Sequence, residues 1–303
     1  MTSLRAGTRG SDLALSQTRW VCERLRAAHT SIDIEEVIVK TYGDSAVAQP
    51  LGTGWPAGGF VGALETALAR GDVDLAVHSY KDLPTAAAPG LVVAAVPRRE
   101  VAHDILVTRK PVDLERLPAG FRIGTSSPRR AAQCRRFGDV EIVPIRGNVP
   151  SRIAGMAQNG LDGVVLAAAG VRRLGIDVPH RIDLPVDRFV PAPAQGALAV
   201  QARRGSRAAE LVAVLNDASV ARLVTAERSF LQGVAAGCHT PVGALATIEG
   251  ALVCLRGQLF SDDGARVVDG TELGEDAGAV GRRLAARLRR ALSAGDGARQ
   301  DRG

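Results

Sequence analysis

The chain has 303 residues, 46% of them hydrophobic, which allows two or three domains with buried cores and includes no apolar run long enough to span a membrane. The net charge is +6, but aromatic residues make up only 3%, which argues against a protein that stacks single-stranded bases. The N-terminus lacks the apolar stretch of a secretory signal, and the four cysteines show no Cys-x-x-Cys spacing, so we expect a cytoplasmic protein without a structural metal site.

The first third of the chain alternates between helical and extended patterns. We expect helices at residues 12–28 and 60–70, and strands at 34–40, 74–77 and 91–96. Residues 43–59 are rich in Gly, Pro, Ala and Thr and have no apolar period, which predicts a long loop of the kind that often acts as a lid.

A second run of the same kind follows. It predicts strands at 104–108, 121–124, 141–145 and 161–167, with helices at 128–136, 149–158 and 168–174. Strands that alternate with helices are typical of α/β domains with mostly parallel sheets. The two runs meet near residues 97–103, which indicates two α/β domains joined by a hinge.

The character of the chain changes at about residue 218. A long helix at 220–234 precedes strand-like segments at 242–249 and 251–260, a hairpin turn at 261–264 and a further strand. A basic amphipathic helix at about 276–292 completes a third domain of the α+β class. Residues 294–303 are polar and Gly-rich, so we expect them to be disordered.

Residues 124–130, Gly-Thr-Ser-Ser-Pro-Arg-Arg, predict an anion site. They follow a strand and open a helix, with Ser127 as the N-cap. Free N–H groups there, together with Ser126, Arg129 and Arg130, would bind an anion. The alternative is a well-capped helix with solvated arginines. Ligands of open α/β sheets bind at the carboxyl ends of strands, which favours the site.

Arginines recur at other strand ends. Arg9 and Ser11 precede the first helix, Arg146 and Arg152 flank a Gly turn, and Arg172 and Arg173 follow the strand at 161–167. A G+C-rich genome explains the general excess of arginine over lysine, but arginine also suits bidentate recognition of carboxylate and phosphate. Arginines in two domains predict a cleft for a ligand with several such groups. No Walker or dinucleotide pattern points to a nucleotide.

Lys81 and Asp82 are the acid–base candidates. They lie in His-Ser-Tyr-Lys-Asp-Leu-Pro, residues 78–84, directly after a buried strand. A carboxylate there can be partly desolvated and can steady a developing cation. An exposed Lys-Asp turn is an equally good interpretation of the pattern. We expect His78 to be structural.

Cys238 lies in a loop bounded by Gly and Pro, where a thiol does not fill a core, so we expect it to take part in chemistry. Cys22 and Cys254 fall in apolar patterns and are predicted to be small core residues. The pattern around Cys134 indicates neither role.

Together and in this order, these segments resemble the porphobilinogen deaminase family over nearly the whole chain. The segments that carry the resemblance are residues 5–11, 78–84, 124–130, 146–148 (Arg-Gly-Asn), 191–197 (Pro-Ala-Pro-Ala-Gln-Gly-Ala), 226–231 (Ala-Glu-Arg-Ser-Phe-Leu) and 237–238 (Gly-Cys). The combination is specific, although each piece alone is not.

The resemblance implies three domains: residues 1–98 with 196–216, residues 102–190, and residues 218–293. The first two would be α/β domains like those of periplasmic binding proteins, and the third would carry Cys238. In this family the thiol holds a dipyrromethane cofactor through a thioether. Four porphobilinogen units are then joined head to tail to hydroxymethylbilane, with loss of ammonia, in tetrapyrrole biosynthesis. The resemblance also implies a cytoplasmic monomer with no nucleic-acid or membrane partner.

The resemblance assigns roles to individual residues. Asp82 matches the catalytic aspartate, which would accept pyrrole N–H groups and stabilise a cationic azafulvene. The residues expected to bind substrate or cofactor carboxylates are Arg9, Ser11, Lys81, Ser127, Arg129, Arg130, Arg146, Arg152 and Arg173. Further pocket residues are Phe60, Thr125, Ser126 and, near the interdomain crossover, Gln195.

The chain departs from the family pattern in lid and turn segments. Thr53 and Ala57 stand where lysines are usual, and Ala194 and Ala236 stand where glycines are usual. Three other interpretations stay open: a two-lobed module that binds anionic ligands, a divergent paralogue with low activity, and a nucleic-acid binder suggested by the isoelectric point of 9.7. Scattered arginines and few aromatics favour a small polyanion over nucleic acid.

Overall fold

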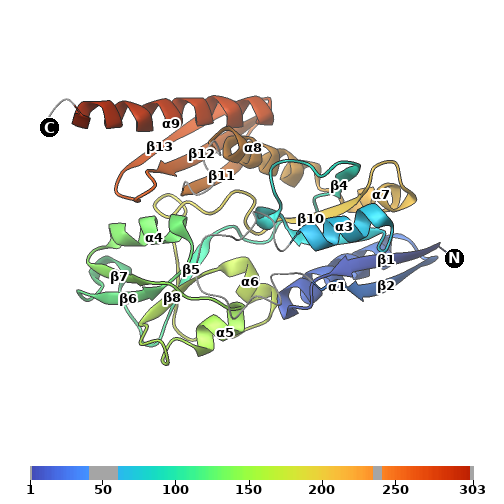
Figure 1. The fold of residues 1–303 in the computed structure, drawn as a ribbon, viewed down its shortest axis with the longest axis horizontal. Coiled ribbons are helices and arrows are strands. Elements are labelled where there is room, and N and C mark those ends of the chain that lie inside the picture. Colours follow the sequence, from blue (N-terminus) through green and yellow to red (C-terminus); the bar gives the residue numbers. More distant parts are fainter. Residues whose placement is uncertain (1, 41–60, 235–240, 301–303) are drawn as a thin grey trace. The chain divides into compact units, whose positions relative to one another are not determined.

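A computed structural model describes residues 2–40, 61–234 and 241–300, with side chains to residue 294 (Figure 1). Cys238, Phe60 and the predicted loop at 43–59 lie outside the described residues. The chain divides into two compact units. Unit 1 comprises Met1–Glu100, Arg172–Gly175 and Gly196–Ala221, and unit 2 comprises Val101–Val171, Ile176–Gln195 and Arg222–Gly303.

Unit 1 contains a five-stranded sheet of order β2-β1-β3-β10-β4. Its elements are β1 (Thr2–Thr8), α1 (Asp12–Ala28), β2 (Ile32–Ile38), α3 (Gly62–Arg70), β3 (Leu75–Ser79), the 3₁₀ turn η1 (Tyr80–Asp82), β4 (Leu91–Ala95), β10 (Leu198–Arg203), α7 (Arg207–Val212) and the 3₁₀ turn η4 (Ala213–Leu215).

Helices cover both faces of this sheet. Successive side chains of a strand point to opposite faces. Leu75 and Val77 of β3 accordingly lie in a core that also contains Val21 of α1, whereas Ala76 lies in a second core with Leu68 of α3. Burial on both faces explains why β3 begins with three consecutive apolar residues, Leu75 to Val77, rather than with an alternating pattern.

Unit 2 begins with a second five-stranded sheet, of order β7-β6-β8-β5-β9. Its elements are β5 (Asp104–Thr108), the 3₁₀ turn η2 (Leu114–Arg116), β6 (Phe121–Gly124), α4 (Pro128–Cys134), the 3₁₀ turn η3 (Arg135–Phe137), β7 (Val140–Val143), α5 (Val149–Ala154), β8 (Gly163–Ala167), α6 (Ala168–Arg173) and β9 (Arg181–Asp183).

The two sheets have the same topology. In each, three parallel strands are followed by an antiparallel strand, β10 in one and β5 in the other, and then by an edge strand that is antiparallel to it. The α/β class is confirmed, and four of the five strands in each sheet run in the same direction, as expected, while β10 or β5 runs against them. A strand that enters the sheet from a distant part of the chain is not bound by the right-handed crossover that makes βαβ neighbours parallel.

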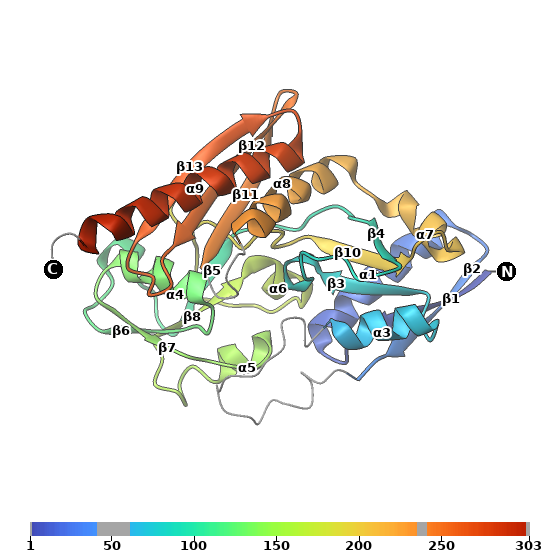
Figure 2. The same ribbon diagram turned by 45° about the horizontal axis from the view of Figure 1, so that its top comes forward.

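The C-terminal part of unit 2 forms the expected α+β arrangement. Its elements are α8 (Ala218–Val234), β11 (Val242–Glu249), β12 (Leu252–Phe260), β13 (Val267–Gly274) and α9 (Ala277–Gln300), with the three strands in an antiparallel sheet. Phe230 of α8, Leu255 of β12 and Leu284 of α9 share one core, and Figures 1 and 2 show both helices beside the sheet. A side chain at Gly281 would lie 2.4 Å from the Ala226 carbonyl, so glycine lets the two helices approach.

Two differences from the sequence-based expectations concern the chain after residue 180. Residues 294–300, expected to be disordered, continue α9, whose Ala- and Arg-rich sequence favours a helix despite Gly295 and Gly297. The strands β9 and β10 and the helix α7 were not predicted. None of the helices among the described residues combines the length and apolar content needed to cross a membrane.

Candidate functional site

Four of the predicted site residues lie at one edge of the unit 1 sheet. Strands β1 and β3 are parallel neighbours, with Gly7 opposite Ala76. Their carboxyl ends therefore meet at the same edge, where Arg9 and Ser11 follow β1, and Lys81 and Asp82 follow β3. The structure thus brings together two segments that are about seventy residues apart in the sequence.

Hydrogen bonds hold these two strand ends. The Ser11 hydroxyl caps α1 by accepting the Ala14 N–H at 3.4 Å. Further along α1, the amide of the buried Gln17 donates to the Ser79 hydroxyl at 3.0 Å, and that hydroxyl donates to the Gln17 oxygen at 3.1 Å. Ser79 is the last residue of β3, so the pair ties the start of the Lys81–Asp82 turn to α1. Polar residues in a helix give no sign of such a distant partner, and the sequence did not indicate Gln17.

Asp82 is exposed and Lys81 is half-buried. Of the two interpretations that the sequence left open for this turn, the exposed one therefore holds for Asp82. The turn itself is well anchored, since the Tyr80 N–H donates to the Ala197 carbonyl at 3.0 Å and Leu83 is buried beneath it. The backbone thus presents the Asp82 carboxylate to solvent from a fixed turn.

His78 precedes this turn and is buried in β3. Burial lowers its pKa to about 4, opposed by a weaker hydrogen bond to Gln201. The imidazole is therefore neutral near pH 7, which agrees with the structural role expected for it.

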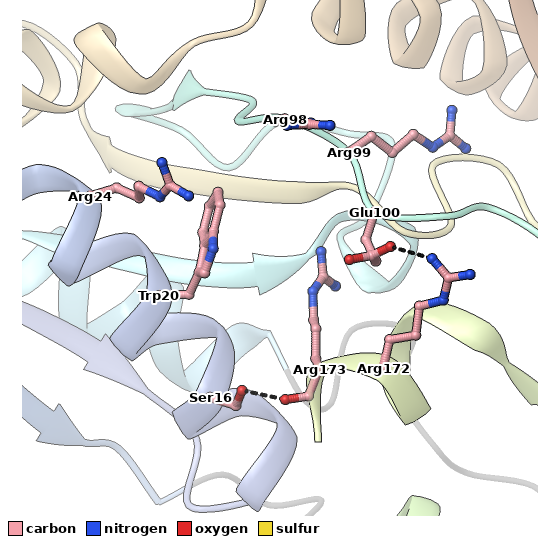
Figure 3. A pocket seen from close by; sticks show the side chains of 8 residues that line it. All are labelled: Ser16, Trp20, Arg24, Arg98, Arg99, Glu100, Arg172 and Arg173. Carbon is pink, nitrogen blue, oxygen red and sulfur yellow. Dashed lines mark hydrogen bonds and ion pairs between the residues drawn. The ribbon is translucent and has the colours of Figure 1, made fainter. Parts of the chain in front are cut away.

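Among the residues that the structure describes, Arg173 is the remaining predicted site residue of unit 1 (Figure 3). It lies at the end of α6, half-buried, and donates to the Gly196 carbonyl at 2.8 Å. Its own carbonyl accepts the Ser16 hydroxyl at 3.0 Å. Burial lowers the pKa of this guanidinium, partly offset by the charge of Glu100.

The other predicted site residues that the structure describes lie around one edge of the first unit 2 sheet. The carboxyl ends of the parallel strands β6, β7 and β8 meet there, together with the amino end of the antiparallel β5. Thr125, Ser126 and Ser127 follow β6, and Arg146 follows β7. This edge is the expected place for a ligand of an open α/β sheet.

The hydroxyls of this segment organise the turn into α4. The Ser127 hydroxyl caps the helix by accepting the Arg130 N–H at 3.4 Å, and the Thr125 hydroxyl accepts the Ser127 N–H at 3.2 Å. The Ser126 hydroxyl donates to the Ile145 carbonyl at 2.8 Å, which joins the ends of β6 and β7. The N-cap predicted at Ser127 is confirmed.

Arg129 and Arg130 surround a buried carboxylate. Their side chains are 6% and 7% exposed, and each lies within 2.9 Å of an oxygen of the fully buried Asp104. Arg130 also donates to the Val165 carbonyl at 3.0 Å, and Arg129 to the Val190 carbonyl at 2.9 Å. Burial lowers the pKa of Arg129, although Asp104 opposes the shift. The alternative of solvated arginines is therefore wrong.

Gln195 joins the same cluster. Its amide donates to Asp104 at 3.0 Å and to the Ala102 carbonyl at 2.7 Å. Asp104 thus orients two guanidiniums and one amide. The sequence indicated Gln195 and the arginine pair but not Asp104. A carboxylate at the first position of the apolar strand Asp-Ile-Leu-Val-Thr was the available signal, because a buried charge needs a partner.

Arg146 and Arg152 flank the turn after β7, and both are half-buried. Asn148, which the sequence did not single out, caps α5 between them by accepting the Ser151 N–H at 2.9 Å. Gly147 makes this turn possible, since its φ of 106° lies in the range that side-chain-bearing residues rarely adopt.

The described cysteines are poor nucleophiles. Cys22 and Cys134 are buried, and burial raises their pKa values to about 11 and about 12. The core role predicted for Cys22 is confirmed, and Cys134 has the same one. Cys254 is only half-buried, because it lies on β12 between two core positions, and its pKa is also raised by burial.

Comparison with known proteins identifies the family. A family model described as "Porphobilinogen deaminase, dipyromethane cofactor binding domain" matches residues 4–210, and one described as "Porphobilinogen deaminase, C-terminal domain" matches residues 221–290. The chain belongs to the porphobilinogen deaminase family. The resemblance inferred from the motifs is thereby confirmed.

Individual relatives agree. A porphobilinogen deaminase of Rubrobacter xylanophilus is 45% identical over 284 residues, covering 93% of this chain and 92% of its own. Another of Nocardia farcinica is 45% identical over 302 residues, covering 95% and 86%. One of Deinococcus deserti is 40% identical, covering 91% of each chain.

Solved structures were compared as well. The methionine binding protein MetQ is 12% identical with a TM-score of 0.44, covering 70% of this chain and 89% of its own. The effector binding domain of BenM is 16% identical with a TM-score of 0.41, covering 70% and 88%. The strand orders of the two five-stranded sheets, rather than these likenesses, define the fold class.

The described residues suit the cofactor in the family description. Arginines and hydroxyls at both sheet edges are donors for the carboxylates that a dipyrromethane carries. Among the predicted site residues that the structure describes, Asp82 is the one carboxylate, and it is exposed. The arginines and hydroxyls therefore suit a ligand with several carboxylates, and the Asp82 carboxylate is the one anion among them that can stabilise a developing positive charge.

Proposed function

We propose that this chain is a transferase that joins four porphobilinogen units head to tail into hydroxymethylbilane and releases ammonia at each addition. The observation that carries the proposal is the 45% identity to a porphobilinogen deaminase over 93% of the chain. The match of a second family model to residues 221–290 favours the enzyme over a two-lobed binding module, which would have no need of the C-terminal domain.

Asp82 is the proposed catalytic residue. Loss of ammonia from porphobilinogen leaves a cation, which a nearby carboxylate stabilises electrostatically. The same carboxylate accepts pyrrole N–H groups and so orients the ring. Support comes from the anchored turn that presents Asp82 at the same sheet edge as Arg9 and Ser11.

The carboxylates of substrate and cofactor are assigned to the predicted cations and hydroxyls of both units. Each pyrrole carries an acetate and a propionate, so a growing chain gathers negative charge that arginines neutralise. Arg129 and Arg130 would act from a cluster already ordered by Asp104, which lowers the entropic cost of binding.

Cys238 is the proposed attachment point of the cofactor. A dipyrromethane bound there supplies the primer to which substrate units are added. The raised pKa values of Cys22, Cys134 and Cys254 support this choice, because a thioether forms from the thiolate.

The domains, compartment and assembly are part of the same proposal. We place the domain boundaries at residues 1–98 with 196–216, 102–190 and 218–293, which agree with the three separate sheets. The protein would act as a cytoplasmic monomer on a small-molecule substrate, with no nucleic-acid or membrane partner.

The intact mass of the purified protein tests the proposal most directly. We expect a covalent increment of two pyrrole units that is lost in Cys238→Ser. The variant Cys134→Ser is the control and should keep the increment, since Cys134 is buried. An unmodified wild-type mass, together with no ammonia release from porphobilinogen, would contradict the function.

A further inference from the structure

The backbone at Ala194 is held in a conformation that its side chain disfavours. Among the residues that the structure describes, Ala194 is the one residue other than glycine with a positive φ, at 61°. It is fully buried, in the segment between β9 and β10. Left-handed backbone at a residue with a Cβ persists only where the surroundings hold it, and such positions cluster at functional sites. The contacts of Ala194 therefore show what holds it.

Glu227 of α8 provides the holding contact. Its Oε2 accepts the Ala194 N–H at 2.6 Å, and its Oε1 accepts the Ala246 N–H of β11 at 2.9 Å. Both bonds are buried, and Glu227 itself is 0% exposed. Hydrogen bonds to a carboxylate are shorter and stronger than those between neutral groups. One buried side chain of α8 thus fixes the backbone of two segments that are distant in the sequence.

The conformation of Ala194 directs the next residue, Gln195. The Gln195 N–H donates to the Ala192 carbonyl at 3.0 Å, which closes a four-residue turn. Ala194 occupies the third position of this turn, where a positive φ usually goes with glycine. From the turn, the Gln195 amide reaches Asp104 at 3.0 Å and the Ala102 carbonyl at 2.7 Å. A change of backbone at Ala194 would therefore withdraw the amide from Asp104.

Asp104 connects this turn to the paired arginines, Arg129 and Arg130. Its Oδ1 accepts the Gln195 amide at 3.0 Å and the Arg130 guanidinium at 2.7 Å, so one oxygen serves both donors. Its Oδ2 lies 2.9 Å from Arg129. All the residues from Glu227 to the paired arginines are buried and belong to unit 2. A close-packed interior transmits small displacements rather than absorbing them.

We propose that Glu227 is a positioning residue for carboxylate binding. By holding Ala194 in the left-handed conformation it fixes the turn that carries Gln195, and through Asp104 it orders the paired arginines. Its two oxygens bond backbone N–H groups, so this effect on a ligand is exerted through other residues. The role rests on the proposed function, because the carboxylates are those of the substrate and cofactor assigned to the same arginines.

Glu227→Gln tests this role. The amide nitrogen of Gln cannot accept a hydrogen bond and its oxygen is a weaker acceptor than a carboxylate, so the bond to Ala194 is lost or weakened. KM for porphobilinogen should rise about fivefold and kcat should fall less than about twofold, because ordered arginines bind substrate and transition state alike. Turnover is calculated per cofactor-bearing molecule, counted by intact mass. An unchanged KM overturns the proposal.

Ala194→Gly in the Glu227→Gln background separates positioning from a general loss of stability. Glycine adopts a positive φ without steric cost, so the turn no longer needs the carboxylate, and KM should return to within about twofold of wild type. Glu227→Gln with Ala246→Gly is the matched control, since it makes the same change at the residue bound by the other oxygen. Its KM should stay raised. A raised KM with Ala194→Gly, or recovery with Ala246→Gly, overturns the proposal.

Chemical modification of arginine gives a readout that does not need the reaction. Phenylglyoxal modifies accessible guanidinium groups, and peptide mass spectrometry follows each arginine separately. In Glu227→Gln the paired arginines should react at least about threefold faster than in wild type, because a loosened cluster opens more often. Ala194→Gly should restore the slow rate, while Arg256, exposed in the same unit, reacts equally in all variants. Equal rates at the paired arginines in wild type and Glu227→Gln overturn the proposal.

The proposed function and the positioning role of Glu227 would fail in different ways. If the wild type releases no ammonia from porphobilinogen, the function fails, and the modification rates decide whether Glu227 orders the arginines. If ammonia is released but Glu227→Gln changes neither KM nor the rates, only the positioning role fails. Where Glu227→Gln alone does not fold, its combination with Ala194→Gly carries the test. Folded protein with a wild-type KM then supports the role, and failure to fold or a raised KM overturns it.

Discussion

The carboxylate of Glu227 accepts a 2.6 Å hydrogen bond from the backbone N–H of Ala194. Both residues are fully buried, and Ala194 has a φ of 61°, in the left-handed region that disfavours side chains. The second oxygen of Glu227 accepts the Ala246 N–H of β11 at 2.9 Å. One glutamate of α8 therefore joins the C-terminal sheet to the residue before Gln195, which contacts Asp104. It supports the strained backbone beside the arginine cluster.

Glu227→Gln should lower the free energy of unfolding by about 2 kcal/mol. The amide nitrogen of Gln would face one of two buried N–H groups, and a buried donor without an acceptor costs about 1–3 kcal/mol. Urea unfolding measures the change. Glu275→Gln removes an exposed carboxylate of the same unit and should cost less than about 0.5 kcal/mol. Equal stability of the two variants would contradict the bridging role.

Asp104→Asn should lower the free energy of unfolding by more than Glu227→Gln does, in total by about 3–5 kcal/mol. It leaves two buried guanidiniums without their counter-charge, and an uncompensated buried charge is costly. Thermal or urea unfolding is the measurement. Asp269→Asn is the matched control, because Asp269 pairs with Arg256 at 2.9 Å on the surface and should cost no more than about 1 kcal/mol. A small loss in Asp104→Asn would show that the arginines do not need this carboxylate.

Asp82→Asn should reduce turnover at least about 100-fold, since the neutral amide no longer stabilises the developing cation. Stability should change by less than about 0.5 kcal/mol because the side chain is exposed. Ammonia release from porphobilinogen and urea unfolding are measured on the same preparation. Asp72→Asn, also exposed in unit 1, should leave both unchanged. Full activity of Asp82→Asn would refute the catalytic role.

His78 should make stability depend on pH. Its folded pKa of about 4 lies below the unfolded value of 6.5, so the unfolded state binds the proton first as the pH falls. The stability contribution is present above pH 6.5 and is lost, by an amount on the order of 3 kcal/mol, as the pH falls from 6.5 to 4.

His78→Gln should remove this slope. Carboxylates also titrate at the lower end of the interval, so the informative quantity is the difference in unfolding free energy between wild type and variant at pH 7, 6 and 5. That difference should narrow as the pH falls. The variant His180→Gln is the control, because it replaces a half-buried histidine of unit 2. Parallel stability curves for wild type and His78→Gln would show that His78 does not titrate on unfolding.

Much of the fold was predictable because its signals are local. The strands predicted at 104–108 and 121–124 are confirmed at those bounds, since short segments with apolar residues between polar or Gly-containing turns indicate strands. The helix at 12–28 is likewise confirmed, with a cap and an apolar period that belong to one continuous segment. Strand β10 was missed because the apolar, Gly-containing stretch before it has no period, and its place between β3 and β4 depends on residues more than a hundred positions away.

The candidate site, like the fold, was predictable from the sequence only in part. Residue types and spacing were sufficient to identify the family and the segments around Asp82, Ser127 and Cys238, because each segment is contiguous in the sequence. Whether a residue is buried, and which residue it meets, depends on contacts between segments. Only the folded chain showed that Asp82 is exposed and that Arg129 and Arg130 form ion pairs with the buried Asp104. The free energy of a charge is set by its burial and its partners, and neither is encoded within a few residues of it.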